Sequence, residues 1–107
     1  MHFAVLFEDE PAKSGERARH LAAHLDFLEA EAAAIRAAGP LSEGSDPAGG
    51  LWLVEADNAA AVEALVRRDP FWPTGLRRRV RILRWTRVFA EGRRLERIDP
   101  ERNHSGS

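Results

Sequence analysis

His24 and Asp69 are the two side chains of this sequence whose chemistry suits an acid/base pair. An imidazole takes up and releases protons near neutral pH. A carboxylate beside one ring nitrogen fixes the tautomer and makes the other nitrogen more basic. Leu21 stands three positions before His24 and Leu28 four positions after it, so on a helix the histidine borders an apolar stripe. If the fold joins His24 to Asp69, the pair can act as a general acid/base toward a small molecule.

Both residues also have a structural explanation, and spacing alone favours it. A partly buried histidine commonly bonds a backbone carbonyl, and Asp69 precedes Pro70, which is an ordinary way to end a helix. His20 lies four positions before His24 and could share its helix face, but no third metal ligand stands nearby. We therefore expect His20 at the surface and no metal site.

The first half of the chain predicts a strand followed by a long helix. The apolar run over 2–7 is typical of a buried strand. Ser14 is a suitable cap for a helix that continues to about Ala37, because Ala, Glu, Arg and Leu dominate there. Gly39 and Pro40 end this helix, or a short extended piece after it. The expected core stripe of the helix consists of Leu21, Leu25, Leu28, Ala32 and Ile35.

The second half repeats the order of strand and helix. A polar loop over 42–50 leads into a strand over 51–56. Asp57 or Asn58 then caps a helix that ends at Asp69. Strands and helices that alternate in a small domain predict an α+β sandwich with the helices on one face of the sheet.

The last predicted strand runs from about Arg79 to Phe89. Val80 and Ile82 alternate with arginines there, which indicates one buried and one solvated face. The same alternation splits the basic cluster between two faces, so a solvated edge or ion pairing across a dimer explains it better than a nucleic-acid site. An arginine directed into a pocket would bind a carboxylate. The cluster consists of Arg77, Arg78, Arg79, Arg81, Arg84 and Arg87.

Composition indicates a single small domain over 1–90, followed by a charged, frayed tail over 91–107. The chain has 107 residues, a net charge of -1 and no cysteine, so we expect neither nucleic-acid nor membrane binding and no thiolate chemistry. It has no apolar run of roughly 18 residues and no secretory signal, which favours the cytoplasm. A domain of this size leaves much of its surface exposed, so an apolar sheet face predicts a homodimer.

Several motifs follow one another in a fixed order along the chain. They are His-Leu-x-Phe-Leu, Ala-Gly-Pro-Leu, Gly-x-Leu-x-Leu-Val-Glu-Ala, Asp-Pro-Phe, Gly-Leu, Val-x-Ile and Trp. In this order the sequence resembles the YCII-related (YciI-like) family over about residues 2–89. The resemblance implies a ferredoxin-like α+β fold of the βαβ type with an antiparallel sheet. It also implies that two subunits join as a dimeric α+β barrel.

The resemblance further implies a site. In YciI-like proteins a histidine of the first helix and the aspartate of the Asp-Pro dipeptide form the active-site dyad, here His24 and Asp69. The family's Gly-Pro turn borders the pocket, which implies that Gly39 and Pro40 line it, although a purely structural turn also explains them. Phe71 and Trp72 follow Asp69 and are expected to line the pocket, or else to pack in the core or at a subunit contact.

Two functions of different classes follow from this interpretation. One is a small cofactor-independent enzyme, lyase or dehydrochlorinase-like or hydrolase-like, that uses the His–Asp dyad on a small acidic or phenolic molecule. The other is a non-catalytic dimer that binds a small molecule or another protein. A monooxygenase-like relative is a third alternative. The sequence has no flavin, nicotinamide or phosphate-loop signature, so we expect no cofactor.

Overall fold

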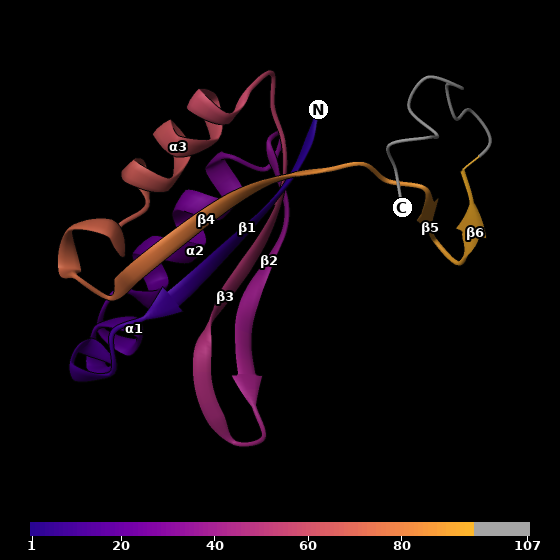
Figure 1. Cartoon of the computed structure of the whole chain (residues 1–107). Helices are drawn as coiled ribbons and strands as arrows, with labels where there is room; N and C mark the ends of the chain where they lie inside the picture. The colour runs from indigo at the N-terminus through magenta and orange to yellow at the C-terminus, as the bar shows by residue number, and fades with distance from the viewer. Residues whose placement is uncertain (96–107) are drawn as a thin grey trace.

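The computed structural model describes residues 1–95 of the chain. It contains a sheet of four long strands, three helices and a small second sheet (Figure 1). The elements are β1 (His2–Asp9), η1 (Pro11–Lys13), α1 (Gly15–Arg19), α2 (Leu21–Ala30), β2 (Ile35–Glu43), β3 (Asp46–Glu55), α3 (Ala59–Arg68), η2 (Trp72–Thr74), β4 (Arg77–Trp85), β5 (Phe89–Ala90) and β6 (Arg93–Arg94).

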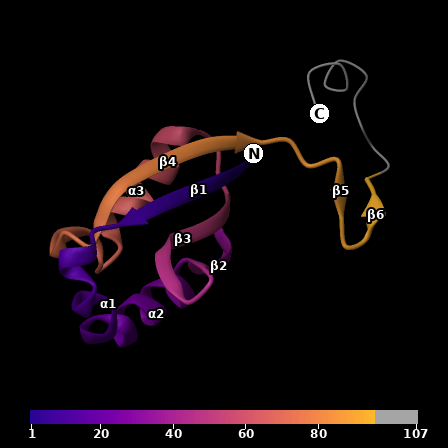
Figure 2. The same cartoon turned by 60° about the horizontal axis from the view of Figure 1, so that its bottom comes forward.

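The four long strands form one antiparallel sheet in the order β2-β3-β1-β4. Each helical segment connects two strands that are not neighbours in this order, which is the ferredoxin-like arrangement. The helices α2 and α3 lie on the same face of the sheet (Figure 2). The predicted α+β class, antiparallel sheet and one-sided helices are therefore confirmed. In the part of the chain that the structure describes, no helix is both long and apolar enough to cross a membrane.

The core lies between the sheet and these two helices. Along β1, Phe3, Val5 and Phe7 point into it, while the residues between them point to the other face. Strand β3 and helix α3 supply most of the remaining apolar side chains, and this face-to-face burial holds the two layers together. The buried core consists of Phe3, Val5, Phe7, Ile35, Trp52, Val54, Val62, Leu65 and Val66.

The prediction of one helix from Ser14 to Ala37 was wrong. The helical segment breaks at His20, whose backbone is not helical, and it ends at Ala30. Ile35 instead begins strand β2 and pairs with Val54 of β3. Helix propensity is a weak preference, and pairing with a partner strand outweighs it in this alanine-rich segment.

Because the helix ends at Ala30, the predicted core stripe is only partly correct. Leu21 and Leu25 are 43% and 49% exposed, and Ala32 is also exposed. Leu28 packs against the edge of the core, and Ile35 reaches the core from a strand rather than from a helix.

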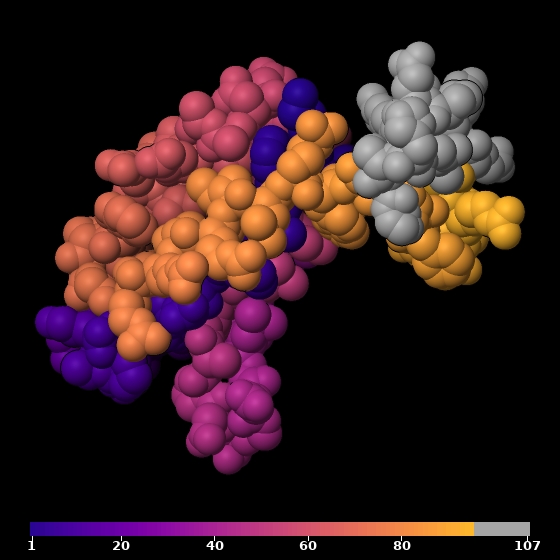
Figure 3. Space-filling model, in the orientation of Figure 1, coloured from indigo at the N-terminus to yellow at the C-terminus, as the bar shows by residue number. Residues whose placement is uncertain are grey.

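Gly39 and Pro40 do not end a helix, and the segment 42–50 is not a loop. Gly39 pairs with Leu51 and Pro40 with Gly50, inside the β2–β3 hairpin. Proline lacks a backbone N–H, and an edge strand such as β2 tolerates it because its outer side needs no partner. The hairpin projects from the body of the molecule, at the bottom of Figure 3.

The second helix follows its prediction closely. The Asn58 side chain accepts a hydrogen bond of 2.8 Å from the Ala61 N–H, so Asn58 rather than Asp57 is the cap. Helix α3 ends at Arg68, and Asp69 follows it in an extended conformation that suits the residue before proline.

The last long strand is shorter than predicted, because β4 runs from Arg77 to Trp85 rather than from Arg79 to Phe89. The alternation within it is confirmed: Val80 and Ile82 pack against the core, while Arg79 and Arg81, which alternate with them, are exposed. Strands β5 and β6 form a small hairpin that extends away from the main sheet (Figure 1). Part of the predicted frayed tail is therefore a turn, and its residues 96–107 lie outside the described part of the chain.

Candidate active site

His24 lies in the middle of α2 on the side that faces the sheet, and it is 7% exposed. Its ring stacks on the ring of Phe71, with centroids 4.2 Å apart and planes 20° from parallel. This contact holds the imidazole plane from one side. The histidine, placed by the helix, therefore meets the segment that follows α3.

Asp69 is 2% exposed, and its carboxylate is held from several sides. Oδ1 lies 2.8 Å from His24 Nδ1 and also accepts a hydrogen bond of 3.0 Å from the Phe71 N–H. Oδ2 lies 3.4 Å from Nη2 of Arg77. The extended backbone at Asp69, required by Pro70, directs the carboxylate toward α2.

Opposing effects set the proton affinity of this carboxyl group. Burial raises the pKa of Asp69, but hydrogen bonds from His24 and Phe71 and the charges of His24 and Arg77 together hold that pKa below its ordinary value of 3.8. Asp69 is therefore an anion at neutral pH and can only accept hydrogen bonds. It follows that Nδ1 of His24 carries the proton of the shared bond, which leaves Nε2 as the basic nitrogen.

Two arginines and a second aspartate extend the network. Nη1 of Arg77 lies 3.7 Å from Oδ1 of Asp9, and Nη2 of Arg17 lies 2.6 Å from the other oxygen of Asp9. The Arg77 guanidinium also covers the Phe7 ring at 3.9 Å. Burial lowers the pKa of Arg77 and the Asp69 carboxylate opposes that shift; an arginine stays charged in either case. A continuous chain of charged groups thus joins α2, the Asp-Pro segment, β4, β1 and α1.

A cavity of about 270 Å³ lies between α2 and the β2–β3 hairpin, beside this network. Gly39 and Pro40 line it, as does His24. Its wall is mainly apolar, with His24, Arg17 and Arg77 as the polar side chains, which is the usual character of a site for a small molecule. The lining residues are Arg17, Leu21, His24, Leu25, Leu28, Ala38, Gly39, Pro40, Gly50, Trp52 and Arg77.

Phe71 and Trp72 were expected to line this cavity, but neither does. Phe71 is fully buried behind the His24 ring and supports it rather than facing the cavity. Trp72 begins the short turn η2, where its side chain is directed outward under the guanidinium of Arg67, and it lines a separate surface pocket. The turn explains the difference, since consecutive residues of a 3-10 helix point in different directions.

His20 lies at the break between α1 and α2, partly exposed, with Nε2 3.1 Å from Glu16. The expected surface position of this histidine is confirmed. Among residues 1–95, no group of three His, Cys, Asp or Glu side chains is arranged to hold a metal ion.

Comparison with known protein families assigns the chain to one of them. The family model of the YCII-related domain matches residues 1–86, and the chain belongs to this family. It is similar in structure to 5-chloro-2-hydroxyhydroquinone dehydrochlorinase from Burkholderia phenoliruptrix AC1100, solved in complex with 2,5-dihydroxybenzoquinone. The two chains share 30% sequence identity and a TM-score of 0.73 over 80% of this chain and 94% of the other. No curated protein matches the sequence.

Sequence reasoning did not single out Arg77, Asp9 or Arg17. Arg77 stood in a run of three arginines, just before the predicted start of the last strand at Arg79, so the alternation within that strand did not place it. The sheet register shifts between Glu8 and Asp9, however, and this β-bulge turns Arg77 inward. The sequence interpretation offered only the general point that an arginine directed into a pocket would bind a carboxylate, and it selected no particular arginine.

Proposed function

We propose that this protein is a small cofactor-independent enzyme of the lyase type, with His24 as its general acid/base and Asp69 as the residue that positions it. The hydrogen bond of 2.8 Å between them, buried beside an apolar cavity, is the observation that supports the proposal most strongly. The similar dehydrochlorinase binds a hydroxylated quinone ring. A small phenolic or acidic molecule is accordingly the proposed substrate class.

In the proposed reaction, Nε2 of His24 takes a proton from the substrate, and Asp69 stabilises the imidazolium that forms. The electron pair released on the substrate moves into its ring system and expels a leaving group from the same molecule. For a chlorinated hydroquinone the products are the dehydrochlorinated ring at the quinone level, one proton and one chloride ion, so atoms and electrons balance without an oxidant. His24 then gives its proton to solvent and is ready for another cycle.

Chloride release tests this proposal. Native protein is expected to release chloride from 5-chloro-2-hydroxyhydroquinone or from another chlorinated hydroquinone of a small panel. His24→Gln should lower the rate by about 100- to 10,000-fold, the usual contribution of a general acid/base. His20→Gln is the matched control, because this histidine lies outside the cavity and should keep the native rate.

The alternative function has a clear signature in the same experiment. A non-catalytic binding protein would bind 2,5-dihydroxybenzoquinone, release no chloride from any compound, and bind the ring equally well after His24→Gln. That result would contradict the enzyme proposal.

We also propose that two copies of the chain pair through the open face of the sheet. Ala4 is flanked in register by Leu53 and Leu83, and Leu6 by Leu51, so aliphatic side chains occupy adjacent rows of this face. Within residues 1–95, all helices lie on the opposite face, and Leu83 is 38% exposed. A second copy would cover these rows, as a small domain with an uncovered apolar face requires.

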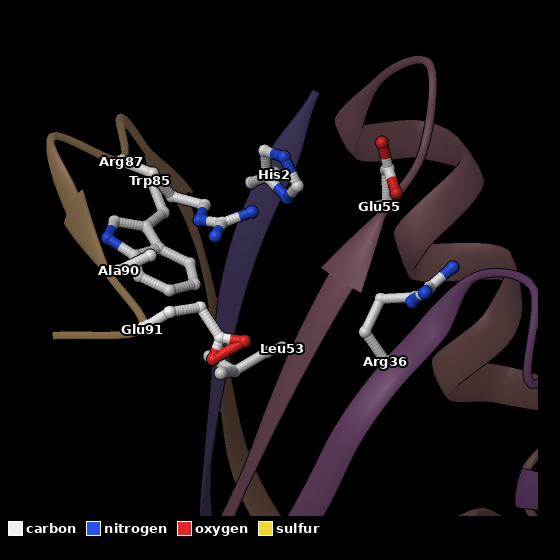
Figure 4. A pocket seen from close by; sticks show the side chains of 8 residues that line it. All are labelled: His2, Arg36, Leu53, Glu55, Trp85, Arg87, Ala90 and Glu91. Carbon is white, nitrogen blue, oxygen red and sulfur yellow. The ribbon is translucent and has the colours of Figure 1, made fainter. Parts of the chain in front are cut away.

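A hollow marks one end of this open face. The strand residues His2, Leu53 and Trp85 form its floor, and Arg87 and Glu91 approach from the segment around β5 (Figure 4). Its volume is about 420 Å³. The mixed charges of its rim suit the polar border of a subunit interface, where ion pairs surround an apolar centre.

A further inference from the structure

Arg17 is a charged side chain that remains accessible beside the cavity of His24. It belongs to α1, and its side chain is 28% exposed, whereas that of Arg77 is 3% exposed. Nε and Nη1 of Arg77 are buried without a partner, but in the described part of the chain no side-chain atom of Arg17 is in that position. Of the two arginines that line the cavity, Arg17 is therefore the one that a ligand can reach.

A contact with Asp9 orients the Arg17 guanidinium. Nη2 of Arg17 donates a hydrogen bond of 2.6 Å to Oδ2 of Asp9, and no described residue accepts one from Nε or Nη1. A guanidinium carries five N–H donors in one plane, so most of them remain available after this bond is made. Asp9 thus fixes the position of Arg17 and leaves donors for a second anion, which charge-assisted hydrogen bonds would hold.

The ring of Phe71 links Arg17 to the histidine. The guanidinium carbon lies 5.4 Å from the centroid of this ring, and His24 stacks on the same ring with centroids 4.2 Å apart. Arg17, Leu21 and His24 also line one cavity. The cation and the imidazole are therefore neighbours around a single aromatic ring, a separation that one substituted six-membered ring can span.

Two cavities share the side chain of Arg17. The first, of about 270 Å³, is lined by His24 and is mainly apolar, and the second, of about 300 Å³, is bordered by Asp9, Glu10 and Ser14. Among the described residues, Arg17 alone lines both of them. A ligand ring that lies beside His24 can therefore direct a polar substituent toward the Arg17 guanidinium.

The proposed chemistry at His24 requires a cation that the substrate can contact. When His24 takes a proton from a substrate hydroxyl, the oxygen gains a negative charge, and a cation beside it stabilises that charge. Arg77 is held by Asp69 and closed off by Gly50, where an added Cβ would lie 3.2 Å from Nη1 of the arginine. Arg17 is the cation of the cavity wall that meets this requirement.

We propose that Arg17 is the substrate-binding residue of this site, and that its remaining N–H groups bind an anionic oxygen, a phenolate or a carboxylate, on a small ring beside His24. This inference rests on the proposed function for the identity of the reaction, but the anion site itself is independent of turnover. Asp9 is the positioning residue, because it holds one part of the guanidinium and leaves the rest to the ligand. The substrate class is thereby narrowed to rings whose anionic oxygen faces α1.

Calorimetric binding of small rings tests the anion site without any reaction. Benzoate and benzamide form one pair of an anionic and a neutral probe of similar size, and 4-nitrophenolate and 4-nitroanisole form another. In at least one pair, native protein should bind the anion about tenfold or more tightly than the neutral ring, since a charge-assisted hydrogen bond is stronger than a neutral one. A preference in the first pair identifies a carboxylate ligand, and in the second a phenolate; either supports the site.

Arg17→Gln assigns this preference to the arginine. The variant removes the charge and should reduce the preference for the anion to about twofold or less. Arg19→Gln is the matched control, because Arg19 lies on the same short helix, pairs with Glu16 and does not line the cavity. This variant should keep the native preference.

The arginine Nε–H signals in the NMR spectrum of native protein give a second test, which keeps the proposal testable if Arg17→Gln impairs folding. The anion that binds more tightly should shift the Nε–H signal of Arg17, because the bound oxygen lies beside its guanidinium. The signal of Arg19 should stay in place, since that side chain lies outside the cavity.

Equal binding of the anionic and neutral probes by native protein would overturn the inference. A preference that survives Arg17→Gln, or an Arg17 signal that saturating anion leaves in place, would overturn it as well. Chloride release that is lost in His24→Gln, with no anion preference in native protein, would refute the anion site alone. A preference that depends on Arg17, in a protein without any turnover, would refute the enzyme proposal alone.

Discussion

Oδ1 of Asp69 lies 2.8 Å from Nδ1 of His24, although 45 positions separate the two residues. The fold achieves this by placing α2 and the end of α3 on the same face of one sheet. The same carboxylate group also accepts the Phe71 N–H and contacts Arg77. Asp69 is therefore the residue on which the geometry of the whole site depends.

Acid should destabilise the native protein through Asp69. Its pKa is lower in the folded state than the ordinary value of 3.8, so the unfolded chain binds the proton more readily. The stabilising contribution is present above about pH 4 and is lost as pH falls through the lower, folded pKa. Urea unfolding measured at several pH values should show this loss in native protein and less of it in Asp69→Asn. Equal pH dependence of both proteins would contradict the role given to Asp69.

Gly49 should be far less replaceable than Gly39. Its φ of 152° is unfavourable for other residues, and an added Cβ would lie 1.8 Å from the Phe7 carbonyl oxygen. Gly49→Ala should therefore cost about 2 kcal/mol or more, since the backbone of β1 or β3 must shift. Gly39→Ala meets nothing within 4 Å and should change the free energy of unfolding by less than about 1 kcal/mol. Chemical denaturation of both variants decides; similar costs would show that the β1–β3 approach is looser than described.

Two copies of the chain should associate through the open face of the sheet. Leu83→Glu places a charge in the apolar rows beside Ala4, and it should weaken dimerisation about 100-fold or more. Light scattering after size exclusion, over a range of concentrations, measures this effect. Ala64→Glu is the control, because Ala64 is exposed on α3 on the opposite side of the sheet. Native protein that stays monomeric, or a dimer that Leu83→Glu does not affect, would refute the proposed interface.

The sequence predicted the fold where local and long-range preferences agree. Helix α3 has a capping residue, apolar positions that match its buried side and an Asp-Pro stop, and these three signals place it correctly. Strand β2 has no such agreement. Its alanine-rich beginning favours a helix locally. The segment is extended only because it pairs with β3, and a local sequence pattern does not reveal this pairing.

The site was only partly predictable for a similar reason. His24 and Asp69 are identified by residue type and by the family pattern, but no local signal shows that Arg77 is buried. Its orientation depends on the register shift opposite Glu8 and Asp9, which is a property of two paired strands. Leu21 and Leu25 had the spacing of core residues, and they line the cavity instead. Periodicity finds apolar sides of helices but does not distinguish a core from a binding site.

The proposed chemistry depends on one protonation state: the proton of neutral His24 on Nδ1, held by Asp69, with Nε2 free to act as the base. Long-range proton–nitrogen NMR correlations of the imidazole ring measure this tautomer directly. Native protein is expected to show a protonated Nδ1 and an unprotonated Nε2, and Asp69→Asn a loss of this fixed tautomer. A protonated Nε2 in native protein, or the same tautomer in both proteins, would contradict the acid/base role of the pair.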